Sequence, residues 1–201
     1  MGHRAGGDHH RVQVTAVVAR TPRRRIRWRG VLLGLAVGLV VAAFAWRPVA
    51  PAFSIWAAQR VIARAFPAVP QWPTAEVAAR LDQVQLLDVR EPVEHAVSHL
   101  PGARQVAPDA DPAELVRTLD PARPAVLYCS LGYRSSLLAE RLIAAGFTNV
   151  ANLRGCIFVW AAEGRPIESN GVPARVVHPY SPRFAFLLPQ DLAAEVPPAG
   201  E

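Results

Sequence analysis

Three short apolar runs, set among segments with helical patterning, constrain the fold of this chain more than any other feature. The runs are VQLLDV (84–89), PAVLY (124–128) and NVANL (149–153). Each is too short for an ordinary helix and continuous enough for a strand buried on both faces. Helical segments are predicted at residues 75–82, 91–97, 112–120, 136–146 and 156–164, and a further short strand within residues 103–108. Strands that alternate with helices predict an α/β fold, in which helices flank a parallel sheet.

Two helix starts carry recognisable capping chemistry. Thr74 is expected to cap the helix predicted at residues 75–82. Asp111, which precedes Pro112, has the residue order that favours an N-cap followed by the first helical position.

The net positive charge of the chain comes from its first quarter. The 201 residues carry a net charge of +6. Residues 1–47 contribute nine arginines and one acid, a net of +8, whereas residues 48–201 contribute thirteen arginines and fifteen acids, a net of −2. Because binding to nucleic acid needs cations clustered on the folded domain, we expect no nucleic-acid partner.

Residues 30–46 (GVLLGLAVGLVVAAFAW) form an uncharged apolar run that predicts one transmembrane helix ahead of the domain. As a helix these residues would span roughly 25 Å, the short end for crossing a bilayer. Arginines crowd the N-terminal flank, so the positive-inside rule places residues 1–29, a basic disordered N-terminus, in the cytoplasm. The domain is then expected on the periplasmic side of a bacterial inner membrane. A cleaved signal peptide ending near Ala43–Ala45 stays an alternative.

The apolar run also contains a glycine pattern. Gly30, Gly34 and Gly38 lie four residues apart on one face of the predicted helix. This doubled G-x-x-x-G spacing lets two helices approach closely and is compatible with a homodimer. Small residues are common in such segments in any case, so the pattern leaves dimerisation open.

The rest of the chain divides into a linker, a domain and a tail. Residues 47–70 are a proline-bracketed juxtamembrane linker, whose central part (54–66) has one apolar face and predicts an amphipathic helix. That helix either lies on lipid or packs on the domain. Residues 71–170 form the α/β domain. Residues 171–201 are a proline-rich tail, and its apolar first part is expected to pack on the domain.

A cysteine lies one residue past the carboxyl end of the strand predicted at 124–128, where parallel sheets gather their functional residues. The loop from Cys129 to Arg134 leads into a helix N-terminus, whose free N–H groups and partial positive charge lower the pKa of a thiol. Gly132 permits a tight turn, and Arg134 supplies a fixed cation. The loop can therefore cradle an anion above a nucleophilic sulfur. Cysteine phosphatases have the pattern C-x5-R, and the shorter C-x4-R here favours a persulfide over a phosphocysteine.

Three blocks of the sequence together resemble the rhodanese-like sulfurtransferases. They are LLDVREPVEHAVSHLPGA (86–103), YCSLGYRSS (128–136) and NLRGCIFVWAAEGRPIE (152–168). The resemblance implies a rhodanese-like α/β fold. It also implies an enzyme that moves sulfane sulfur from a small donor anion such as thiosulfate to cyanide or a thiol. We expect no cofactor and no metal site.

The same resemblance implies roles for individual residues. Cys129 is the nucleophile that carries the persulfide. The residues expected to bind substrate are Ser130, Leu131, Gly132, Tyr133 and Arg134, and those expected to support the loop are Asp88, Arg90 and Ser135. The alternative is a non-catalytic rhodanese-like module that binds a partner or senses redox state at the membrane. The intact Cys129 and Arg134 disfavour it.

Two positions depart from the family pattern. Ser130 stands where classical thiosulfate enzymes often have arginine, which removes one cation that would bind the donor. Cys156 stands where relatives more often have a small residue. It is either a resolving thiol that attacks a Cys129 persulfide or forms a disulfide with it, or a small buried side chain that packs the turn.

The charged residues of the first block have simpler interpretations. Glu91 and Glu94 are expected to be solvated helix charges. His95 is expected on the surface, and His99 is expected to be structural.

Overall fold

The computed structural model describes residues 49–196. The helices are α2 (Val49–Ala65), α3 (Thr74–Ala78), α4 (Pro92–Val97), α5 (Pro112–Val116), α6 (Tyr133–Ala144) and α7 (Cys156–Ala162), with short 3-10 helices η1 (Leu81–Gln83) and η2 (Pro182–Leu187). The strands are β1 (Gln71–Trp72), β2 (Gln85–Asp88), β3 (Arg104–Gln105), β4 (Ala125–Tyr128), β5 (Val150–Leu153), β6 (Glu168–Ser169) and β7 (Val172–Pro173). These elements confirm the predicted alternation of strands and helices.

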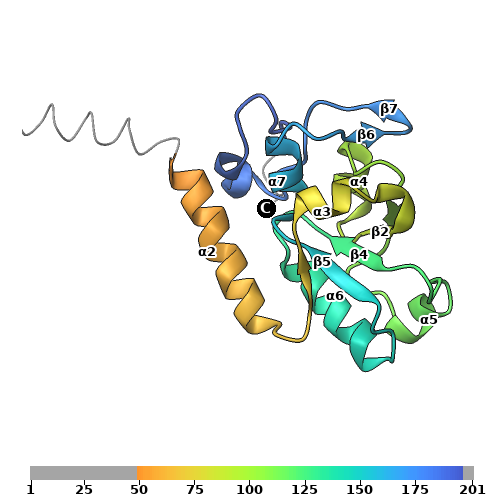
Figure 1. Cartoon of the computed structure of the whole chain (residues 1–201). Helices are drawn as coiled ribbons and strands as arrows, with labels where there is room; N and C mark the ends of the chain where they lie inside the picture. The colour runs from red at the N-terminus through yellow and green to blue at the C-terminus, as the bar shows by residue number, and fades with distance from the viewer. Residues whose placement is uncertain (1–48, 197–201) are drawn as a thin grey trace, which may run out of the picture. The chain divides into compact units, whose positions relative to one another are not determined.

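Five strands form one parallel sheet in the order β1-β5-β4-β2-β3 (Figure 1). Strand β4 lies at its centre, paired with β2 on one side and with β5 on the other. The sequence pattern missed β1, because a strand of two half-buried residues carries no apolar run. The central place of β4 brings the ends of β2 and β5 beside the cysteine that follows it.

The two faces of the sheet bury separate apolar clusters, because successive side chains of a strand point to opposite faces. Leu86 and Val126 face a cluster that includes α3 and α7, whereas Leu87 and Leu127 face a cluster that includes α5 and α6. All four strand residues are buried. This explains why the central strands read as unbroken apolar runs rather than as an alternating pattern.

Of the two predicted N-caps, one is found in the structure and the other is not. The Asp111 side chain accepts a hydrogen bond from the backbone N–H of Ala113 at 2.9 Å, which confirms it as an N-cap. Thr74 is not a cap: it is the first residue of α3, and Pro73 occupies the cap position. Its hydroxyl donates instead to the Glu163 carboxylate at 2.6 Å, which ties α3 to the end of α7.

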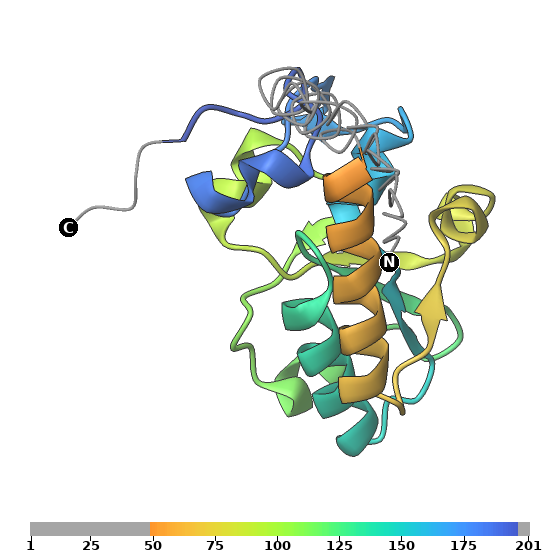
Figure 2. The same cartoon turned by 90° about the vertical axis from the view of Figure 1, so that its left-hand side faces the viewer.

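The linker and the tail both pack on the domain. Ile62 of α2 and Phe66, which follows the helix, are buried in the cluster that contains α6. Of the two alternatives for this helix, packing on the domain is the one found (Figure 2). From the tail, Val177, Leu187 and Leu188 are buried in the other cluster, which confirms the expected packing of its apolar part. The 3-10 helix η2, which belongs to the tail, lies beside the first half of α2 (Figures 1 and 2).

The predicted basic N-terminus and the predicted transmembrane run at residues 30–46, with its three glycines, lie outside the described residues. Within residues 49–196, no helix is both long enough and apolar enough to span a bilayer.

Candidate active site

Cys129 is the first of four residues between β4 and α6, and the six-residue loop from Cys129 to Arg134 extends into the first turn of α6. The loop is also held by α7, since the N–H groups of Ile157 and Phe158 donate to the carbonyls of Cys129 and Ser130 at 3.2 and 3.4 Å. Gly132 has a φ of 122°, and a Cβ there would come within 3.3 Å of the Asn152 side chain. The tight turn therefore needs glycine for both conformation and space.

The sulfur of Cys129 is enclosed by hydrogen-bond donors. The backbone N–H of Gly132 donates to Sγ at 3.0 Å. Burial alone would raise the pKa of this thiol, but hydrogen bonds from Cys156 and Ser135 and the positive charge of Arg134 outweigh it and hold the pKa well below the ordinary value. The lowered pKa of Cys129 favours its thiolate, which is the nucleophilic form.

Cys156 lies directly beneath the loop. Its Sγ accepts a hydrogen bond from the backbone N–H of Cys129 at 3.3 Å and lies 3.1 Å from the carbonyl oxygen of Leu153. It is fully buried, and neither cysteine is in a disulfide. Burial and the neighbouring Cys129 thiolate raise the pKa of Cys156 well above its ordinary value. The two neighbouring thiols are thus shifted in opposite directions, with the pKa of Cys129 lowered and that of Cys156 raised.

Arg134 is bound by a carboxylate that the sequence pattern placed wrongly. Glu94 was expected to be solvated, but its side chain is 2 % exposed and accepts from Arg134 at 2.6 and 2.9 Å. The Ser130 hydroxyl also donates to Glu94, at 3.0 Å. Burial alone would raise the pKa of Glu94, but Arg134 outweighs it and lowers the pKa. Glu94 lies on α4, and this residue holds both ends of the Cys129 loop.

Glu94 had one sequence signal that could have revealed it. It is the third residue of α4, and its carboxylate accepts from the backbone N–H of Glu91 in a capping box. A capping carboxylate is oriented back along the chain, which limits its freedom to extend into solvent. Glu91 is exposed, so the prediction of a solvated carboxylate, made for both Glu91 and Glu94, holds for Glu91 alone.

Asp88 and Arg90, the predicted supports, act on the residue before Cys129. The Arg90 guanidinium binds the Asp88 carboxylate at 2.6 Å, and both side chains are fully buried. The Tyr128 hydroxyl donates to Asp88 at 2.9 Å and accepts from the backbone N–H of Leu100 at 3.0 Å. Burial would raise the pKa of Asp88, but hydrogen bonds from His95, Arg90 and Tyr128 lower it. The support is therefore indirect, through Tyr128.

The two histidines lie beside this cluster. His95 is not a plain surface residue: its Nδ1 lies 3.0 Å from the Asp88 carboxylate. His99 stacks on His95 with ring centroids 3.9 Å apart and bonds the His95 carbonyl, in keeping with a structural role. Among residues 49–196, no group of three or more His, Cys, Asp and Glu side chains is placed to hold a metal ion.

A cavity of about 430 Å³ lies over the loop, and all the residues predicted to bind substrate line it. Its other walls come from segments that the sequence did not connect with the site. Helix α2 contributes Val61 and Ile62, and the tail contributes Tyr180 and Phe184. The Tyr180 ring lies 4.8 Å from the Arg134 guanidinium, close enough for a cation–π contact.

Ser135, the third residue expected to support the loop, does not line this cavity. It is buried, and its hydroxyl donates to the Asn152 side chain at 2.6 Å.

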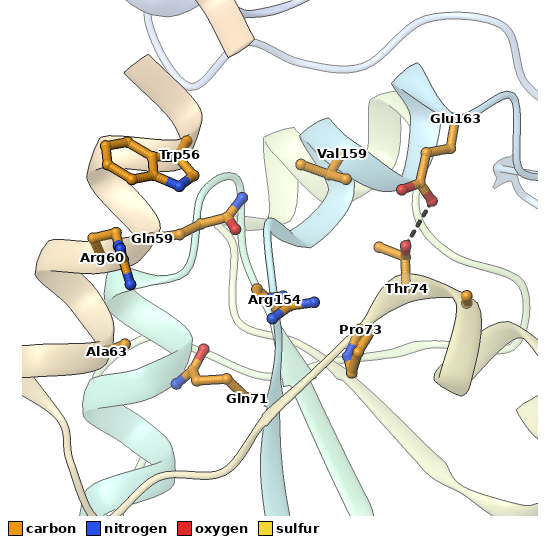
Figure 3. Close-up of a pocket in the computed structure, with 11 residues that line it drawn as sticks. Trp56, Gln59, Arg60, Ala63, Gln71, Pro73, Thr74, Arg154, Val159 and Glu163 are labelled. Carbon is orange, nitrogen blue, oxygen red and sulfur yellow. Dashed lines mark hydrogen bonds between the residues drawn. The ribbon is translucent and has the colours of Figure 1, made fainter. Parts of the chain in front are cut away.

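A second cavity, of about 640 Å³, lies on the other side of α2, toward β1 and α7 (Figure 3). Gln59, Arg60 and Arg154 point into it, and its Glu163 is bonded to Thr74. None of the residues predicted from the sequence to act on substrate lines this cavity. No cysteine is among the described residues that line it, so we place the candidate active site at Cys129.

Comparisons with known proteins bear on the family of the chain. Residues 73–163 match the family described as Rhodanese-like domain. A protein named sulfurtransferase from Allochromatium vinosum is 36 % identical over 89 residues, which cover 44 % of this chain and 82 % of that protein. The probable adenylyltransferase/sulfurtransferase MoeZ of Mycobacterium tuberculosis is 35 % identical over 85 residues, 42 % of this chain. The match spans only 22 % of MoeZ.

A solved structure shows a similar fold. The crystal structure of a thiosulfate sulfurtransferase from Pseudomonas aeruginosa superimposes with a TM-score of 0.51 and 25 % identity, covering 57 % of this chain and 22 % of that one. The parallel sheet, the loop after its central strand and the matched residues lead to one assignment. The chain belongs to the rhodanese-like family.

Proposed function

We propose that this chain is a sulfurtransferase that carries sulfane sulfur as a persulfide on Cys129. The observation that supports this most directly is the environment of its sulfur. Gly132 donates to Sγ at 3.0 Å, and the pKa of the thiol is lowered well below its ordinary value despite burial. A buried thiolate in a loop of this size is a nucleophile prepared for a small electrophilic sulfur. The sulfurtransferase names of relatives support the same reaction class.

The transfer has two steps that balance without a cofactor. In the first, the Cys129 thiolate attacks the outer sulfur of a donor such as thiosulfate. The sulfur–sulfur bond of the donor breaks, sulfite leaves with the electron pair, and Cys129 becomes a persulfide anion. In the second, a thiolate or cyanide attacks the terminal sulfur of the persulfide, and the Cys129 thiolate is restored. The donors that lower the pKa of Cys129 also stabilise it as the leaving group of this second step.

We also propose that residues 30–46 anchor the chain in a bacterial inner membrane, with the domain on the periplasmic side. The support is the uncharged run and the arginines before it. A fusion of the full chain to alkaline phosphatase at its C-terminus should be active in intact cells, and removal of residues 1–48 should release the protein from the membrane fraction. An inactive fusion would reverse the orientation.

Intact-mass measurement of the full chain tests the central proposal. The protein is incubated with thiosulfate, alongside Cys129→Ser and Cys156→Ser. We expect the wild type and Cys156→Ser to gain one sulfur atom and Cys129→Ser to gain none. A loss of two hydrogens, abolished by either substitution, would instead indicate a Cys129–Cys156 redox pair. No change with several sulfane donors under reducing conditions would overturn the sulfurtransferase proposal and favour a binding module.

A further inference from the structure

Among residues 49–196, no cation that lines the cavity over Cys129 is left without a carboxylate partner. Arg134 is the one charged side chain among the described residues that line it. Its guanidinium already makes two hydrogen bonds to Glu94 at 2.6 and 2.9 Å. Its Cζ also lies 4.8 Å from the centroid of the Tyr180 ring. Ser130, where a second cation would help to bind thiosulfate, donates to the same carboxylate.

The walls of the cavity are apolar, and several of them are exposed at its opening. Val61 of α2 is 64 % exposed, and from the tail Tyr180 is 52 % and Phe184 is 41 % exposed. Tyr133, at the end of the loop, is 59 % exposed. These four side chains line the same cavity as Cys129. A ligand that covers them gains the free energy of removing apolar surface from water.

Access to the sulfur itself is narrow. Cys129 is 3 % exposed, so a reacting sulfur must enter on a slender group. A cavity of about 430 Å³ suits a small molecule. The loop N–H groups around Cys129 serve the reacting sulfur itself, so a second charged group on the acceptor would lose its hydration without gaining a free counter-ion. A folded protein surface cannot bring its thiol to this depth without an extended segment.

We propose that the physiological acceptor is a low-molecular-weight thiol carried on an apolar chain or ring. This rests on the proposed function, because it names the second substrate of the same site. The thiolate of the acceptor attacks the terminal sulfur of the Cys129 persulfide. A new sulfur–sulfur bond forms, the bond to Cys129 Sγ breaks, and its electron pair returns to Cys129 as the thiolate. The product is an organic persulfide, and the apolar chain lies against Val61, Tyr180 and Phe184.

A single-turnover experiment on the full chain tests this. Cys129 is loaded with sulfur from thiosulfate or from inorganic polysulfide, and the excess is removed. Straight-chain alkanethiols of increasing length are added, with mercaptoacetate as the anionic acceptor. The loss of the persulfide is followed by quenched intact-mass measurement. We expect the second-order rate constant to rise roughly threefold to fourfold for each added methylene until the cavity is filled, and mercaptoacetate to be the slowest acceptor.

Matched variants locate the effect. Val61→Asn and Phe184→Asn should flatten the dependence on chain length, and both positions are exposed enough to tolerate the change. Val172→Asn is the control, since Val172 is 63 % exposed on β7 and does not line the cavity. It should leave the series unchanged. Circular dichroism checks the fold of each variant.

The outcomes separate this inference from the proposed function. If Cys129 takes sulfur from neither donor, the proposed function fails and this inference fails with it. If Cys129 loads but the rate does not depend on chain length, or mercaptoacetate reacts as fast as the longest alkanethiol, only the acceptor class is wrong. A length dependence that Val61→Asn and Phe184→Asn leave intact also overturns the inference.

Discussion

The guanidinium of Arg134 and the carboxylate of Glu94 form a two-point ion pair, with N–O distances of 2.6 and 2.9 Å. Forty positions separate them in the chain. Arg134 ends the Cys129 loop, and Glu94 lies in the first turn of α4. Bidentate pairs of this kind fix geometry as well as charge. The pair holds the loop in shape and neutralises Arg134, the one cation among the described residues that line the cavity.

Replacing Glu94 with glutamine separates these two effects. The uncharged side chain keeps part of the hydrogen bonding but leaves the charge of Arg134 uncompensated in a largely buried position. We expect the free energy of unfolding to fall by about 1–3 kcal/mol, measured by urea denaturation. We expect the KM for thiosulfate to fall as well, because the freed guanidinium can bind the dianion. Glu114→Gln, at an exposed position of α5, is the control and should change neither value. A higher KM would mean that Glu94 acts on substrate only through the shape of the loop.

The dependence of folding stability on pH below neutrality follows from the carboxylates of Glu94 and Asp88. Burial opposes the charged forms, but Arg134 lowers the pKa of Glu94, and His95, Arg90 and Tyr128 lower that of Asp88. A carboxylate with a lowered folded pKa stabilises the fold fully above its ordinary pKa, which is 4.5 for Glu94 and 3.8 for Asp88. That contribution is lost as the pH falls below these values and through the folded pKa.

Urea unfolding from pH 7 to pH 3 should therefore show a constant stability difference between wild type and Glu94→Gln near neutrality, and a shrinking difference below about pH 4.5. A difference that stays the same down to pH 3 would contradict the lowered pKa of Glu94.

The elements that carry the nucleophile could be predicted from the sequence because their signals are local. The run at 124–128 is apolar on every residue since β4 is buried on both faces, and Cys129 follows it directly. Gly132 marks the turn because only glycine fits a φ of 122° there. The start of α6 was placed three residues late, at Ser136 instead of Tyr133, because Tyr133, Arg134 and Ser135 carry no helical apolar pattern.

The remainder of the site depends on contacts between distant residues. The capping-box position of Glu94 limits its freedom to extend into solvent, but only the structure shows that its partner is Arg134. Val61 and Phe184 lie outside residues 73–163, the part that matches the family, and they reach the cavity through the packing of α2 and η2. No periodicity in either segment indicates which loop it covers.

The hydroxyl of Tyr128 should matter for stability more than its position beside Cys129 suggests. Tyr128→Phe removes the donor to Asp88 and leaves the buried N–H of Leu100 without its acceptor. An unsatisfied buried group costs about 1–3 kcal/mol, so we expect the melting temperature to fall by several degrees. Tyr133→Phe is the matched control, because its side chain is exposed, and it should leave the melting temperature unchanged. An unshifted Tyr128→Phe would mean that water or Asp88 rearranges to replace the hydroxyl.

The tail should be an integral part of the fold although it lies beyond the matched residues. Leu188 is buried in the same cluster as α7. Leu188→Ala should lower the free energy of unfolding by about 2–4 kcal/mol, measured by urea denaturation, because it removes buried methyl groups and leaves a cavity. Val172→Ala, at an exposed position of β7, should cost less than about 0.5 kcal/mol. Equal small effects would show that the tail adds nothing to the core.

Cys156 should tune the acidity of Cys129 even if it never reacts. Its single S–H can reach the Leu153 carbonyl at 3.1 Å or the Cys129 sulfur, and the charged thiolate is the stronger acceptor. Cys156→Ala removes this donor and should raise the pKa of Cys129, whereas Cys156→Ser keeps a donor and should raise it less. The measurement is the rate of iodoacetamide alkylation against pH, with the modified residue identified by mass.

In the wild type the alkylation rate should be half-maximal well below 9.0, the ordinary pKa of the thiol. It should fall only as the pH drops through the lowered pKa, because the thiolate is the reacting species. Cys156→Ala should shift the profile to higher pH. An unshifted profile would assign the low pKa to the loop N–H groups and to Arg134, and would leave Cys156 as a packing residue beneath the loop.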